Sequence, residues 1–179
     1  MNCRNGDSFL NESLNSIVSQ TYKNWNLFFF DNLSTDNSKK IFNSFKDNRF
    51  HYFNFDEPLN LGYARKKAWM KIKSKYVAIC DVDDVFYDNR LEEQLEYLDK
   101  NENCSVVGSN VYLIDEHSNK IEKVNHHFSN EELKLKIQYK HVFNSSTLVF
   151  RKKCVDAVGG YNPNYEMVND YHSLYRVRL

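Results

Sequence analysis

Three aspartates crowd the end of an apolar run, in the stretch YVAICDVDDVFYDNRL at 76–91. Asp81, Asp83 and Asp84 repel one another, so a turn without a counter-charge at this place would cost stability. Carboxylates bind Mg²⁺ or Mn²⁺ through one or two oxygens while phosphate oxygens of a substrate complete the coordination shell. These residue types therefore indicate a divalent metal that faces a diphosphate, although an isolated D-x-D sequence is common by chance.

The residues alone leave other interpretations of these acids open. A solvated turn that caps the next helix needs no ligand, and single acids at such a place usually mean only that. An EF-hand calcium loop counted from Asp81 needs Gly at its sixth position, where the sequence has Phe86. A phosphatase nucleophile also uses D-x-D after a strand, but Val85 stands where that class typically has Thr.

The elements that would position the acids alternate between helix and strand. Apolar residues at helical spacing predict helices, and short apolar runs predict buried strands. We expect helices at 8–22, 32–45, 61–74, 89–101, 129–139 and 169–179, and strands at 24–31, 49–55, 75–80, 105–115 and 145–152. The alternation predicts an α/β layer with a mainly parallel sheet, whose ligands bind beyond the carboxyl ends of the strands. Asp31 and the three acids lie at that edge.

Composition limits the classes of partner. The 179 residues fit one domain, and Lys plus Arg (24) balance Asp plus Glu (24), which provides no electrostatic footprint for nucleic acid. The four cysteines form no CxxC pair, so we expect a reducing, cytoplasmic environment. No run approaches the roughly 20 apolar residues that cross a bilayer, and the N-terminus is polar, so we expect neither a transmembrane helix nor a signal peptide.

Four ordered motifs carry a family resemblance. They are QTYKNWNLFFFDNLSTDNS at 20–38, NLGYARKKA at 60–68, YVAICDVDD at 76–84 and GGYNPNYEMVND at 159–170. In this order and spacing the chain resembles the family 2 nucleotide-sugar glycosyltransferases, which have the GT-A fold, a Rossmann-like sheet flanked by helices. The resemblance implies a single GT-A domain over 1–179. Its nucleotide-binding part would be about 1–100, and its acceptor-side part about 101–179.

The resemblance also implies roles on the donor side. Asp31 would accept a hydrogen bond from the nucleotide base, and Cys3 and Asn5 occupy the loop that lies against base and ribose. Gly62 would allow close backbone approach, and Arg65 would reach the nucleotide. Without the family context, a helix-capping Asp31 and a solvated Arg65 explain these residues equally well.

Roles in the chemistry follow from the same resemblance. Asp81 would contact the ribose, Asp83 would coordinate Mn²⁺ or Mg²⁺ with Asp81 beside it, and Val82 between them joins the cofactor-binding set. Asp84 would order the loop, and Asp170 matches the general base of inverting members. The implied reaction moves a sugar from a nucleotide-diphosphate sugar to an acceptor hydroxyl in surface polysaccharide or lipooligosaccharide synthesis. A UDP-sugar is the donor that we expect first, and the acceptor would be a glycan or a lipid-linked saccharide. We expect a cytoplasmic location at the inner face of the membrane, with peripheral membrane association through parts that the chain lacks.

Departures from the family pattern leave two alternative functions open. Family members begin with an apolar strand before the position of Asn2 and continue further at the C-terminus. We therefore expect the N-terminal strand to be absent, its neighbours to be unpaired, and the chain to be a fragment or to carry a misplaced start. Lys66 and Asn169 replace an Asn and an acid of the family motifs.

The alternative is a non-catalytic remnant that binds nucleotide or a partner. A nucleotidyltransferase would need a glycine-rich phosphate loop, for which NCRNGDS at 2–8 is a poor candidate.

Overall fold

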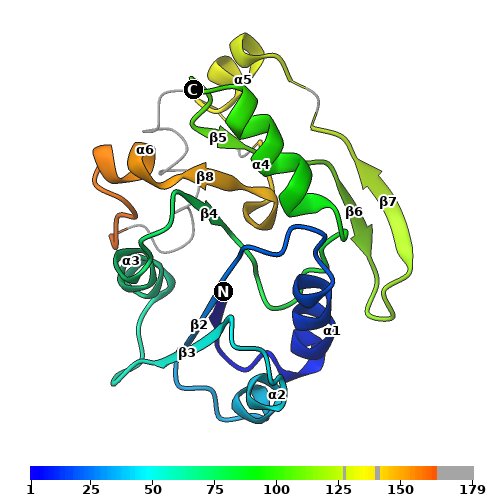
Figure 1. The fold of residues 1–179 in the computed structure, drawn as a ribbon, viewed down its shortest axis with the longest axis vertical. Coiled ribbons are helices and arrows are strands. Elements are labelled where there is room, and N and C mark those ends of the chain that lie inside the picture. Colours follow the sequence, from blue (N-terminus) through cyan, green and yellow to red (C-terminus); the bar gives the residue numbers. More distant parts are fainter. Residues whose placement is uncertain (127, 140–141, 165–179) are drawn as a thin grey trace.

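The computed structural model describes residues 1–126, 128–139 and 142–164 as a mixed α/β fold (Figure 1). In chain order the elements are β1 (Asn2–Cys3), α1 (Asp7–Val18), β2 (Leu27–Asp31), α2 (Ser38–Ser44), β3 (Phe50–Asn54), α3 (Leu61–Lys71), β4 (Tyr76–Ala78), α4 (Arg90–Lys100), β5 (Val106–Val107), β6 (Val111–Ile114), β7 (Lys120–Val124), α5 (Asn130–Lys136), the 3₁₀ turn η1 (Ser145–Thr147), β8 (Val149–Arg151) and α6 (Lys152–Ala157). The alternation of helices and strands over the first hundred residues is as predicted.

Strands β1, β2 and β3 form a parallel sheet that is covered on both faces. Because side chains alternate along a strand, Leu27 and Phe29 of β2 point into one cluster and Phe30 into another. The first cluster receives Leu10 and Leu14 of α1, among others. The second receives alanines of α3, whose small side chains let the helix lie close to the sheet. An aromatic run such as LFFFD is therefore the sequence of a strand buried on both sides.

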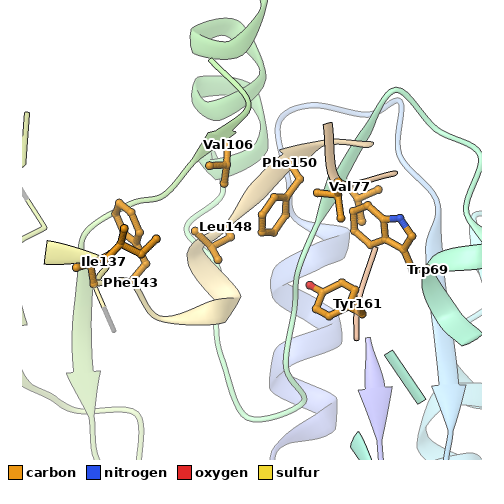
Figure 2. Close-up of a cluster of buried hydrophobic side chains, with 10 residues drawn as sticks. Trp69, Val77, Val106, Ile137, Phe143, Leu148, Phe150 and Tyr161 are labelled. Carbon is orange, nitrogen blue, oxygen red and sulfur yellow. The ribbon is translucent and has the colours of Figure 1, made fainter. Parts of the chain in front are cut away.

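Strands β4, β8 and β5 form a second sheet, and this one is antiparallel. Figure 2 shows its core, in which Phe150 of β8 lies between Val77 of β4 and Val106 of β5. Trp69 of α3 meets the Phe150 ring edge-on at 6.2 Å between centroids. Helix α3 thus contacts both sheets.

We expected no strand at the N-terminus, but the structure has a two-residue strand there, β1. Asn2 pairs with Phe30 and Cys3 with Asp31, in parallel register. Among the described residues no ladder joins β1 to β4, so the parallel and antiparallel sheets remain separate. The expected absence of this strand and of pairing beside it is therefore wrong for β2, which pairs with β1, whereas β4 has no ladder to β1 in the described part of the chain.

The second half differs from the predicted elements in its details. The strand expected at 105–115 is two strands, β5 and β6, and the one at 145–152 begins as the turn η1. Strand β7 was not predicted, because KIEKV is charged and pairs only with β6 in an exposed hairpin. The helix expected at 169–179 lies outside the described residues. None of the described helices has the length and apolar character that crossing a membrane requires.

Candidate functional site

Asp31 ends β2 and is 2% exposed. One of its oxygens accepts the backbone N–H of Ser34 at 2.8 Å, and the other accepts the hydroxyl of Tyr52 at 2.5 Å. Burial, together with the bond to Asp31 and its charge, raises the pKa of the Tyr52 hydroxyl, which therefore stays a neutral donor. The Asp31 carboxylate is thus fixed in direction at the carboxyl end of the parallel sheet.

The loop after β1 is tied to the loop after β2. The N–H of Asn5 donates to Ser34 Oγ at 3.0 Å, and its side-chain oxygen accepts from the N–H of Thr35 at 2.8 Å. Asn5 has a φ of 56°, a left-handed conformation that Asn tolerates better than most residues. Cys3 is 3% exposed, and burial raises the pKa of its thiol. Its side chain belongs to the core behind the loop, which leaves only its backbone for a ligand.

Asp81 is where three parts of the fold meet. Its Oδ2 accepts the hydroxyl of Ser146 at 2.9 Å, and its Oδ1 lies 3.7 Å from Nη2 of Arg65. Its carbonyl oxygen accepts the hydroxyl of Ser13 at 3.3 Å. The structure therefore brings together Arg65 and Asp81, two residues that the sequence analysis assigned to the nucleotide.

The start of α3 explains the position of Arg65. Asn60 caps the helix, because its side-chain oxygen accepts the N–H of Tyr63 at 2.9 Å. Gly62 is buried in the first turn, and Arg65 follows one turn later with a side chain that is 10% exposed. A guanidinium in this place provides one counter-charge for the acid loop, which we define as residues 81–84.

Val82 faces away from Asp81 and Asp83 into the core. It packs against the cluster that contains Cys3, and a Cβ on Gly6 would lie 3.0 Å from one of its methyl groups. Glycine at position 6 thus lets the loop after β1 approach the acid loop. Only the backbone of Val82 remains available to a cofactor.

Asp83 and Asp84 differ in their surroundings. Both residues are exposed, but the described residues give the Asp83 carboxylate no hydrogen-bond or ion-pair partner. Loss of hydration raises the pKa of the Asp84 carboxyl, the hydroxyl of Ser146 lowers it, and the charges of Asp81 and Asp83 raise it. The positive charge of Arg90 lowers the pKa of the Asp84 carboxyl.

Arg90 is a second counter-charge, buried at the start of α4. It is 8% exposed, and its guanidinium stacks on the Phe86 ring at 3.8 Å. It donates to the side-chain oxygen of Gln94 at 3.0 Å and to the carbonyl of Ile79 at 3.3 Å. Burial lowers the pKa of Arg90 to about 10, which still leaves it charged at neutral pH.

The acid loop fits a metal that is shared with a diphosphate. In the part of the chain that the structure describes, no three His, Cys, Asp or Glu side chains gather to hold a metal by themselves. Asp83 offers an unengaged carboxylate, whereas Asp81 is held by Ser146 and Arg65. Mg²⁺ and related ions are commonly bound by one or two carboxylates plus substrate phosphates. Asp83 is therefore the better candidate ligand of the two.

Sequence reasoning missed the polar residues that hold this loop. Ser146 is 65 residues from Asp81, so no local spacing connects them. Ser13 and Ser16 are buried on the inner side of α1, where Ser16 Oγ accepts the N–H of Phe86 at 3.0 Å, and Gln20 is buried just after the helix ends. The spacing of Ser13 and Ser16, three residues apart on one helical face, was the available signal. The predicted base Asp170 lies outside the described residues.

The class of protein follows from a family comparison. The family model described as glycosyl transferase family 2 matches residues 1–159. The chain belongs to this family, and the match covers the first three of its four motifs, whereas the fourth, at 159–170, lies past its end except for Gly159.

Two curated relatives show how much of a family member the chain represents. An uncharacterised glycosyltransferase of Methanocaldococcus jannaschii is 32% identical over 140 residues, which are 76% of this chain and 47% of that protein. A UDP-Glc:α-D-GlcNAc-diphosphoundecaprenol β-1,3-glucosyltransferase of Escherichia coli is 30% identical over 114 residues, 64% of this chain and 45% of that protein. The chain therefore spans about half the length of these relatives.

Solved structures confirm the GT-A fold. Residues 1–349 of TarS from S. aureus match with a TM-score of 0.80 at 14% identity, over 99% of this chain and 53% of that one. The mannosyltransferase PcManGT of Pyrobaculum calidifontis, solved with GDP-Man and Mn²⁺, matches with a TM-score of 0.74 at 14% identity, over 98% of this chain and 50% of that one. The predicted fold class is correct.

Proposed function

We propose that the chain is the donor-binding and catalytic part of an inverting glycosyltransferase. It would transfer a sugar from a nucleotide-diphosphate sugar to an acceptor hydroxyl. The observation that carries this proposal is the arrangement at the acid loop. Arg65 and Ser146, from distant segments, hold Asp81, while the neighbouring carboxylate of Asp83 has no partner among the described residues.

The donor would lie across the carboxyl ends of β1, β2 and β4. Asp31 would accept a hydrogen bond from the base, Asn5 and the backbone of Cys3 would border base and ribose, and Asp81 would contact the ribose. Gly62 and the backbone of Val82 would allow the chain to come close. A UDP-sugar is the first expectation, because the named substrate of the E. coli relative is UDP-Glc and TarS was also solved with UDP-GlcNAc. GDP-Man in the mannosyltransferase makes a guanine nucleotide the alternative to test.

Asp83, with Asp81 beside it, would hold Mn²⁺ or Mg²⁺. Such an ion would neutralise the diphosphate and stabilise the charge of the departing nucleoside diphosphate. Arg65 would contribute a fixed positive charge on the same side. Asp170 would take the proton of the acceptor hydroxyl as its oxygen bonds to the anomeric carbon and the bond from that carbon to the diphosphate oxygen breaks. Attack from the face opposite the leaving group inverts the anomeric configuration.

The acceptor would bind to the second part of the chain. We assign about 1–100 to the donor and about 101–179 to the acceptor. A glycan or a lipid-linked saccharide in surface polysaccharide synthesis is the proposed acceptor class. The acceptor named for the E. coli relative is a diphosphoundecaprenol-linked GlcNAc, and another relative bears the name of teichuronic acid biosynthesis.

Release of nucleoside diphosphate from a panel of UDP- and GDP-sugars tests the proposal. We expect release with Mn²⁺ or Mg²⁺ and its loss with a chelator. Asp83→Ala and Asp170→Asn should each abolish transfer while the melting temperature stays close to that of the unsubstituted chain. Asp99→Ala is the matched control, because Asp99 pairs with Lys75 on the surface and belongs to no proposed contact. Normal turnover in either active-site variant contradicts the proposal, and nucleotide binding without release favours the non-catalytic alternative.

A further inference from the structure

A cavity of about 510 Å³ opens beside the acid loop. Figure 1 shows the hairpin of β6 and β7 next to α4 and above α1, and the cavity is lined by residues of these elements. One end carries Asp83, Asp84 and Ser146, so it is continuous with the proposed metal and ribose contacts. A volume of this size is within the range of small-molecule sites.

Much of the remaining lining of the cavity is apolar and exposed, and we call it the apolar wall. Five of the thirteen large hydrophobic residues exposed in the described part of the chain line it. They are Val85 (42% exposed), Tyr87 (54%), Tyr112 (39%), Leu113 (43%) and Ile114 (37%). Single exposed apolar residues are ordinary, but a gathering of them around one cavity marks a binding surface.

This wall is held in place before any ligand arrives. The rings of Tyr87 and Tyr112 meet edge-on with centroids 6.4 Å apart. Lys120 Nζ lies 5.2 Å from the first ring and 4.7 Å from the second, close enough for cation–π attraction. At the hairpin tip, the Ser118 hydroxyl lies 2.7 Å from both carboxylate oxygens of Glu12 on α1. The hairpin is therefore fixed at its tip and along its side.

We propose that this cavity binds the acceptor, and that the acceptor carries an apolar aglycone next to its reacting sugar. The inference rests on the proposed transferase function. The metal and the donor diphosphate would occupy Asp83, so the hydroxyls of the acceptor sugar match the neighbouring carboxylate of Asp84, and the faces of Tyr87 and Tyr112 match its C–H groups. A free monosaccharide would leave Val85, Leu113 and Ile114 in water. An apolar aglycone covers these three side chains and orients the sugar toward the acid loop.

Calorimetric titration with matched glycosides tests this inference. The probes are octyl and methyl β-glycosides of glucose, galactose and N-acetylglucosamine, each below its micelle-forming concentration. Each methylene removed from water contributes about a fourfold gain in affinity. We therefore expect at least one octyl glycoside to bind about tenfold or more tightly than its methyl counterpart. Equal affinities for octyl and methyl glycosides, or no binding of any octyl glycoside, overturn the inference.

Two variants locate the binding and one controls for it. Leu113→Ser and Tyr112→Ala should each reduce the octyl preference several-fold without changing the melting temperature much, because both side chains are exposed on β6. Tyr97→Ala, an exposed tyrosine of α4 outside the cavity lining, should leave the preference unchanged. A preference that persists in both β6 variants shows non-specific alkyl binding and overturns the inference.

A transfer assay separates this inference from the proposed function. If nucleoside diphosphate release is accelerated equally by octyl and methyl glycosides, transferase function stands and the acceptor inference fails. If octyl preference depends on Tyr112 and Leu113 but no donor is turned over, the proposed function fails and the cavity remains an amphiphile-binding site.

Discussion

Removing the hydroxyl of Ser146 tests whether Asp81 must be held in place to bind the donor. Ser146 is 7% exposed, and its Oγ donates to Asp81 Oδ2 at 2.9 Å. A hydrogen bond to a charged group contributes about 1.5–3 kcal/mol. The Asp81 side chain is 36% exposed, so water replaces part of the lost bond and the lower end of that range applies. About 1.5 kcal/mol corresponds to roughly a tenfold change in a dissociation constant.

We therefore expect Ser146→Ala to weaken binding of UDP or GDP, measured by calorimetry with Mn²⁺, by about tenfold. The free energy of unfolding in urea should fall by no more than about 1.5 kcal/mol, because the same hydrogen bond is present in the unliganded fold. Ser44→Ala on α2 is the matched control, since its hydroxyl donates only to the carbonyl of Ile41. Nucleotide affinity that is unchanged in Ser146→Ala, with a normal melting temperature, would refute the assignment of Asp81 to the nucleotide.

Three further substitutions test separate features of the structure. Tyr52→Phe removes one of the two donors to buried Asp31, so we expect a loss of about 1–3 kcal/mol in urea unfolding; no loss would contradict the buried hydrogen bond. The pKa of Asp84 is raised in the folded state, so its ionised form destabilises the metal-free fold once pH exceeds the ordinary carboxyl pKa of about 3.9. Asp84→Asn should therefore raise the melting temperature at pH 7, and the gain should vanish in acid. Gly108→Ala places a Cβ 2.6 Å from the ring of Phe143 and should cost about 1–3 kcal/mol, read from the same urea titration.

The fold was predictable to the extent that it rests on local patterns. Short apolar or aromatic runs located β2, β3 and β4 near their observed bounds, and β2 is the strand buried along most of its length. Strand β7 and the antiparallel pairing of β4 with β8 were not predictable from spacing. The first pairs exposed, charged residues, and the second joins segments about 70 residues apart.

The candidate site was predictable only in part, and for a related reason. The acids of the acid loop stand together in the sequence and were found from it. Their supports come from elsewhere: Arg65 from α3, Ser13 from α1 and Ser146 from the turn before β8. The family resemblance supplied Arg65. Helical spacing indicates that Ser13 is buried, but nothing in the sequence pairs either serine with Asp81, because a hydroxyl becomes a partner only once folding has brought it within 3.3 Å of its acceptor.

The acid loop also lies between the two separate sheets. It is attached to α1, which covers the parallel sheet, through Ser13, and to the turn that begins the antiparallel strand β8 through Ser146. Gln20, just after α1, donates to the carbonyl of Tyr87 and accepts the N–H of Leu91. A nucleotide bound at Asp81 would stabilise the parallel and the antiparallel sheet at the same time. Ligand binding should therefore make unfolding more cooperative, with amide hydrogen exchange in β2 and β8 slowing together instead of independently.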